Sequence, residues 1–79
     1  MNKNDFFELV ASILAVSADS LSLESTPDQI PSWDSLAHVT MCMALEQTLN
    51  IKFSMADMLS IKSLSDFIDV LGKYSVTLD

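Results

Sequence analysis

Residues that interrupt helices are nearly absent from this chain. Only one Gly and two Pro occur among its 79 residues, at Gly72, Pro27 and Pro31. Proline removes a backbone donor and disfavours helix in the residue before it, whereas most other residues tolerate helical backbone. The sequence therefore predicts uninterrupted helices on both sides of one irregular segment that contains the two prolines.

Apolar residues recur at helical spacing outside that segment. The periodicity predicts a first helix over residues 4–16, a second over 35–49, a short one near 55–59, and a last one from 63 to Gly72. No strand-like alternation occurs before the short tail. The predicted fold is all-α, a small four-helix bundle of three longer helices and one short helix.

Polar residues at three positions predict where helices begin. Asp34 is suited to cap the second helix through its carboxylate. Ser54 followed by Asp57, and Ser63 followed by Asp66, have the spacing of a capping box, with Asp in place of the usual Glu. The short helix and the last helix are each expected to begin at one of these serines.

The apolar periodicity also predicts which parts of the chain are buried. The second helix has apolar residues on opposite sides, so it is expected to be buried centrally. One stripe comprises Leu36, Val39 and Met43, and the other comprises Met41, Cys42, Leu45 and Leu49. The long loop over 17–33 is expected to contact the core at Leu21, Leu23 and Ile30. Residues 74–79 are expected to form a frayed, flexible tail.

Charge and cysteine content limit the partners and the compartment. A net charge of −7 repels nucleic acid and anionic lipid surfaces, so protein partners with basic patches are expected. The single Cys42 cannot form an internal disulfide. Neither a signal peptide nor a run of membrane-spanning length is recognisable. The expectation is a cytoplasmic monomer, one free-standing domain over residues 1–79, without membrane insertion.

The tripeptide Asp-Ser-Leu is the strongest candidate for a chemical site, and it occurs twice. One copy is Asp34-Ser35-Leu36 and the other begins at Asp19. Pro27 follows the copy at Asp19 too closely for a long helix to grow from that copy. Ser35 instead stands in the first turn of a long helix, where free amides and the helix dipole favour an attached phosphate. Ser35 is therefore the favoured site.

The run Trp33-Asp34-Ser35-Leu36, together with Val39 and the later Ala44-Leu45-Glu46, resembles the acyl carrier protein family. The resemblance covers nearly the whole chain, including the order of the helices and the long loop. It implies that Ser35 is the attachment serine for 4′-phosphopantetheine, added from coenzyme A by a phosphopantetheinyl transferase. The arm would hold cargo as a thioester, and the chain would not be an enzyme itself.

The residues around Ser35 receive roles from this resemblance. Asp34, Leu36 and His38 are expected to flank the arm, with His38 one helical turn from the attachment site. Trp33 has two open interpretations, a contact for the arm or partner and an aromatic anchor for the loop. Partner enzymes, an acyl or aminoacyl ligase, synthase or transferase, are expected to contact four residues. These are Trp33, Leu36, Met41 and Asp57.

Other interpretations remain open at this level. Asp34 and Ser35 are also what a simple helix cap requires. His38 and Cys42 share a helix face and have the spacing of a catalytic pair or half a metal site, although no further His or Cys exists to complete one. A cofactor-free acidic adaptor is the alternative from another functional class. Among carriers, Trp33 favours a specialised pathway, polyketide, non-ribosomal peptide or related, over fatty-acid synthesis.

Overall fold

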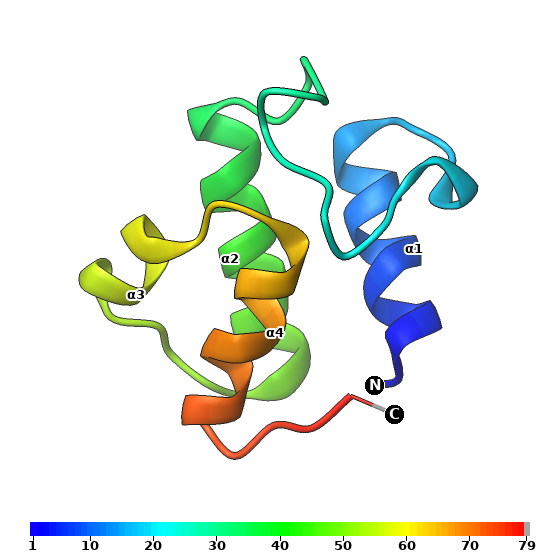
Figure 1. Cartoon of the computed structure of the whole chain (residues 1–79). Coiled ribbons are helices and arrows are strands. Elements are labelled where there is room, and N and C mark those ends of the chain that lie inside the picture. The colour runs from blue at the N-terminus through cyan, green and yellow to red at the C-terminus, as the bar shows by residue number, and fades with distance from the viewer. Residues whose placement is uncertain (79) are drawn as a thin grey trace.

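The computed structural model describes residues 1–78, and they form a bundle of four α-helices (Figure 1). In chain order the elements are α1 (Lys3–Leu14), a 3-10 turn η1 (Ala18–Ser20), α2 (Ser35–Leu49), α3 (Met55–Ser60) and α4 (Leu64–Lys73). The predicted all-α fold with three longer helices and one short helix is confirmed. Among the described residues, no helix is long and apolar enough to cross a bilayer.

α1 is bounded by local chemistry at both ends. At its start Asn2 and Asp5 form a capping box, with the Asp5 N–H donating to Asn2 Oδ1 at 2.8 Å. At its end Ala15 adopts a left-handed backbone with φ of 57°. That conformation ends a helix, so α1 stops two residues before the predicted end at residue 16.

α2 has the predicted bounds because its cap and its composition agree. Asp34 lies in extended backbone, and its Oδ1 accepts the Ala37 N–H at 2.9 Å. No Gly or Pro follows until well beyond Leu49. At the other end Asn50 takes the left-handed conformation that often closes helices, with φ of 55°.

The hydrophobic core lies where α1, α2 and α4 meet. Its fully buried side chains come from all three of these helices. The largest are Phe6, Val10, Leu14, Met41, Cys42, Leu45, Leu64, Phe67 and Leu71. None of the six residues of α3 is fully buried, so this short helix lies on the outside of the bundle.

Only one side of α2 faces this core, and the prediction of a centrally buried helix is wrong. The stripe with Met41 is buried, but the opposite stripe is open to solvent, with exposed fractions of 76% at Leu36, 46% at Val39 and 55% at Met43. Apolar residues on two sides of a helix therefore have two separate explanations here. One stripe packs in the core, and the other is available to something outside the chain.

The loop between α1 and α2 is tied to the bundle along its length. Leu21 and Ile30 pack against the core as predicted. Leu23 is tied by its backbone, because its carbonyl oxygen accepts the Ser65 N–H at 2.9 Å. The loop thereby supplies an acceptor for one of the free amides at the start of α4. The short turn η1 was not predicted.

The tail after α4, for which the sequence predicts fraying, lies against the bundle up to residue 78. The Val76 N–H donates to the Leu71 carbonyl at 3.0 Å, and the Leu78 side chain is buried in the core cluster. Figure 1 shows this segment turning back beneath the bundle. Position 79 lies outside the described residues.

Candidate functional site

The two candidate serines differ in their surroundings. Ser35 is exposed and is the first residue of the fifteen-residue helix α2. Ser20 lies in the three-residue turn η1, where its hydroxyl donates to the Ser17 carbonyl oxygen at 2.6 Å. Only Ser35 therefore combines an exposed hydroxyl with the start of a long helix, as the sequence predicts.

An open pocket of about 420 Å³ lies beside Ser35. The loop, the first turn of α2 and the end of α3 line it together. The lining residues are Pro27, Trp33, Asp34, Ser35, His38, Val39, Met58, Leu59 and Ile61. Most of these side chains are apolar, which is typical of sites for organic ligands with a few polar groups at one edge. The sequence did not place five of these residues at the site, because helical spacing does not indicate which side of a neighbouring segment faces Ser35; they are Pro27, Val39, Met58, Leu59 and Ile61.

His38 connects three segments around this pocket through hydrogen bonds that we call the His38 bridge. The Trp33 Nε1–H donates to His38 Nδ1 at 3.1 Å, and His38 Nε2 lies 2.8 Å from the Met58 carbonyl oxygen. The indole nitrogen only donates and the carbonyl only accepts. The bridge therefore requires one neutral tautomer of His38, with its hydrogen on Nε2.

The His38 bridge changes the expected role of His38 at the arm. The residue lines the same pocket as Ser35, as predicted. Both of its ring nitrogens are occupied by Trp33 and Met58, so neither is free for a phosphate. A contact between His38 and the arm would then involve the carbon atoms of the ring.

Trp33 is an anchor for the loop and also a wall of the pocket. Its side chain is 3% exposed and stacks beside His38, with ring centroids 6.1 Å apart and an interplanar angle of 15°. On the core side both rings approach Phe67, whose centroid is 6.4 Å from Trp33 and 5.6 Å from His38. Such aromatic pairs add to the stabilisation that burial provides. Trp33 and His38 line the pocket, and the fully buried Phe67 packs against both of them.

Two expectations about α2 need correction. Met41 is fully buried, so it cannot contact a partner while the bundle is closed, and its assignment to the docking surface does not hold. Cys42 is also buried, and burial, with the nearby Glu46 carboxylate, raises the pKa of its thiol to about 11. With His38 bonded elsewhere, a catalytic His38–Cys42 pair has no support. Within residues 1–78, no group of three metal-binding side chains occurs.

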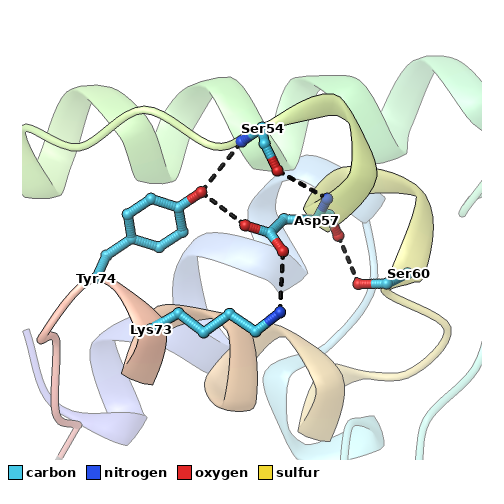
Figure 2. Close-up of polar contacts among 5 residues, drawn as sticks. All are labelled: Ser54, Asp57, Ser60, Lys73 and Tyr74. Atoms are coloured by element: carbon cyan, nitrogen blue, oxygen red, sulfur yellow. Dashed lines mark hydrogen bonds and ion pairs between the residues drawn. The ribbon is translucent and has the colours of Figure 1, made fainter.

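Asp57, another expected partner contact, is held within the protein by α4 (Figure 2). Its side chain is 16% exposed; Oδ2 accepts the Tyr74 hydroxyl at 2.7 Å and Oδ1 lies 3.1 Å from Lys73 Nζ. The Tyr74 oxygen in turn accepts the Ser54 N–H at 3.1 Å. These bonds fix the start of α3 to the end of α4, and the predicted cap from Ser54 to the Asp57 N–H is also present at 3.1 Å. Contact of Asp57 with a partner stays a proposal.

Asp57 is expected to make stability depend on pH in the acid range. The Tyr74 hydrogen bond, followed by Lys73, lowers the Asp57 pKa below 3.8. A lowered folded-state pKa stabilises the fold at pH values above the unfolded pKa, and this contribution disappears as pH falls through the folded-state value. Urea unfolding should therefore show Asp57→Asn to be less stable than wild type at pH 7, with the difference shrinking below pH 3.8.

Tyr74→Phe provides the control, because it removes the hydroxyl that contributes most to the shift. NMR titration should place the Asp57 pKa closer to 3.8 in this variant than in wild type. An unchanged Asp57 pKa would contradict the assignment of the shift to Tyr74.

The start of α2 fits a phosphate ester with an organic arm. Ser35 offers an exposed hydroxyl, the first backbone amides of a long helix favour an anion, and an apolar pocket lies alongside. A family model described as a phosphopantetheine attachment site matches residues 4–71, while comparison with curated proteins gives no significant match. The match extends from α1 into α4 and includes the whole site, and the chain therefore belongs to the acyl carrier protein family, whose members hold a covalent 4′-phosphopantetheine group.

Proposed function

We propose that Ser35 is the attachment residue and that the protein holds acyl or aminoacyl groups for partner enzymes without catalysing a reaction itself. The observation that carries this proposal is the exposed Ser35 hydroxyl at the first residue of α2, beside an apolar pocket. In this proposal the protein acts as a cytoplasmic monomer in a specialised biosynthetic pathway. The family assignment favours a carrier over a cofactor-free adaptor.

The attachment step uses only the hydroxyl of this chain. In the active site of a phosphopantetheinyl transferase, Ser35 Oγ attacks the phosphorus of coenzyme A that bears the pantetheine group. A phosphodiester forms, the hydroxyl proton leaves to a base of the transferase or to water, and adenosine 3′,5′-bisphosphate is released. The attached group supplies a terminal thiol for thioester formation. Asp34 holds the helix start through its bond to the Ala37 N–H, which keeps Ser35 at the surface.

The direct test is to incubate the protein with coenzyme A and a phosphopantetheinyl transferase and to analyse it by mass spectrometry. We expect one phosphopantetheine increment per chain, on the peptide that contains Ser35. An increment on the peptide that contains Ser20 would reject the assignment. No increment with transferases of broad specificity would reject the carrier function.

The partner enzymes are proposed to dock on the exposed apolar side chains next to Ser35. On α2 these are Leu36, Val39 and Met43, and on α3 they are Met55 and Leu59. A group of exposed apolar residues is unusual on a small monomer and indicates an interaction surface. An enzyme that acts on Ser35 or its arm must cover the neighbouring Leu36, so this surface is continuous with the proposed site.

The docking surface has little charge to attract a basic partner. Glu46 is the one acidic residue within α2, and its Oε2 accepts the Phe53 N–H at 2.8 Å. Carriers of fatty-acid synthesis typically meet Arg and Lys of their enzymes through carboxylates on this helix. The scarcity of such carboxylates supports partners from a specialised pathway, with a fatty-acid carrier as the alternative.

Docking should therefore depend weakly on salt. Exposed charges at the edge of an interface mainly set the association rate and its salt dependence, and this surface has few. We expect turnover of the loaded protein by its matched ligase or synthetase to change little between 50 and 500 mM NaCl, and a fatty-acid ketosynthase to accept it poorly. Efficient turnover by the ketosynthase that falls steeply with salt would instead support the fatty-acid alternative.

A further inference from the structure

Two of the rings that line the pocket, those of Trp33 and His38, lie next to the buried Phe67 of the core, and we call this side of the pocket its floor. Trp33 and His38 both line the pocket, and on their other side both approach Phe67, which is fully buried and does not line it. An acyl group that entered beside Ser35 would therefore meet these rings before it reached the interior of the bundle. Passage beyond them requires at least one ring to move.

The His38 bridge restrains that movement. His38 is bonded on one side to Trp33 and on the other to the Met58 carbonyl of α3, at 3.1 and 2.8 Å. Turning the imidazole out of the floor breaks both bonds and leaves the indole N–H and the carbonyl without partners, which is costly away from water. The floor is thus fixed by hydrogen bonds as well as by packing.

The floor also has no polar group left for cargo. Within residues 1–78, every buried side-chain nitrogen and oxygen has a hydrogen-bond partner. The remaining walls nearby are the side chains of Val39, Met58, Leu59 and Ile61. The inner part of the pocket therefore suits the hydrocarbon end of an acyl group.

We propose that Trp33 and His38 determine the specificity of this carrier for cargo length, so that the pocket shelters a short apolar acyl group and leaves the rest of a long chain in solvent. This inference rests on the proposed attachment at Ser35. It concerns the substrate class, because the preferred cargo is a short apolar acyl thioester and not a long fatty acyl chain.

The test uses carriers made directly with acyl groups, by supplying a phosphopantetheinyl transferase with acyl-coenzyme A from acetyl to dodecanoyl. Mass spectrometry first confirms the acyl increment at Ser35, and its absence would reject the attachment site before the length series begins. The unfolding midpoint Tm is then measured for each product. Each methylene that leaves water should raise Tm by up to about 6 °C in a domain of this size.

We expect the wild-type Tm to rise along the series and to level off before dodecanoyl. In His38→Ala the floor is open, so the rise should continue to longer chains. Gln47→Ala, at an exposed position of the same helix outside the pocket and the docking surface, serves as the matched control and should level off with wild type. A wild-type Tm that is flat from acetyl onward, or rises through dodecanoyl, would overturn the proposal, as would the same levelling-off point in His38→Ala.

A second measurement needs no variant, so the proposal is tested even if His38→Ala does not fold. Trp33 is the only tryptophan, so its ring protons can be assigned without ambiguity. Nuclear Overhauser contacts should connect the terminal methyl of a short acyl group to the Trp33 ring. With dodecanoyl cargo the terminal methyl should lack this contact, and contacts from it to Phe67 would show that the floor does not limit length.

Discussion

Replacing Ser35 with alanine is expected to abolish phosphopantetheine incorporation completely while the fold remains intact. The substitution removes the only atom to which the arm can be joined. It removes no core contact, because Ser35 is exposed, and alanine is a good helix former at the first position of α2. The Asp34 bond to the Ala37 N–H also remains. Mass spectrometry measures the loss, and circular dichroism should show unchanged helicity.

Ser20→Ala is the matched control for this loss. It changes the serine of the second Asp-Ser-Leu tripeptide and removes only a local bond to the Ser17 carbonyl. Incorporation should equal that of wild type. Modification that persists in Ser35→Ala, or that disappears in Ser20→Ala, would move the attachment site away from the start of α2.

Replacing Phe67 with alanine should have the largest effect on stability. Phe67 is fully buried and lies where α4 meets the rings of Phe6, Trp33 and His38. Truncating a buried phenylalanine typically costs about 3–5 kcal/mol, through lost burial and the cavity left behind. Small domains have about 5–15 kcal/mol in total, so much of the stability would be lost. Denaturant titration should show a strongly reduced midpoint.

Leu36→Ala is the control for Phe67→Ala, because it also removes an apolar side chain but does so at an exposed position. Its free energy of unfolding should lie within about 0.5 kcal/mol of wild type, because the side chain is 76% exposed and leaves no cavity. Equal midpoints for Leu36→Ala and Phe67→Ala would contradict the core described here. A loss of partner turnover in Leu36→Ala at normal stability would support the docking surface.

Sequence predicts best where several local signals agree. The bounds of α2 follow from the Asp34 cap, the absence of Gly and Pro and the apolar periodicity. The end of α1 was missed because the left-handed turn at Ala15 has no signature in residue type; alanine is an unusual choice there. The packing of Leu78 was missed because it depends on where the tail returns to the bundle, which is a tertiary property.

The site was predicted only in part, because some of its contacts join residues that are not neighbours in sequence or on one helix. Ser35 and its cap are local in sequence, whereas the His38 bridge joins Trp33, before the helix, to Met58 of another helix. No helical spacing relates these three residues. The two apolar stripes of α2 illustrate a second limit, because apolar residue type alone does not distinguish a side chain that packs in the core from one that awaits a partner.

The way α3 is attached has a consequence for the order in which the bundle opens. None of its six residues is fully buried, and Figure 2 shows its first turn tied to α4 through Asp57 and Tyr74, while Met58 is tied to His38. A helix this short has little stability of its own. Local opening is easiest where few apolar contacts must be broken. Amide hydrogens of α3 should therefore exchange with solvent before those of α1, α2 and α4.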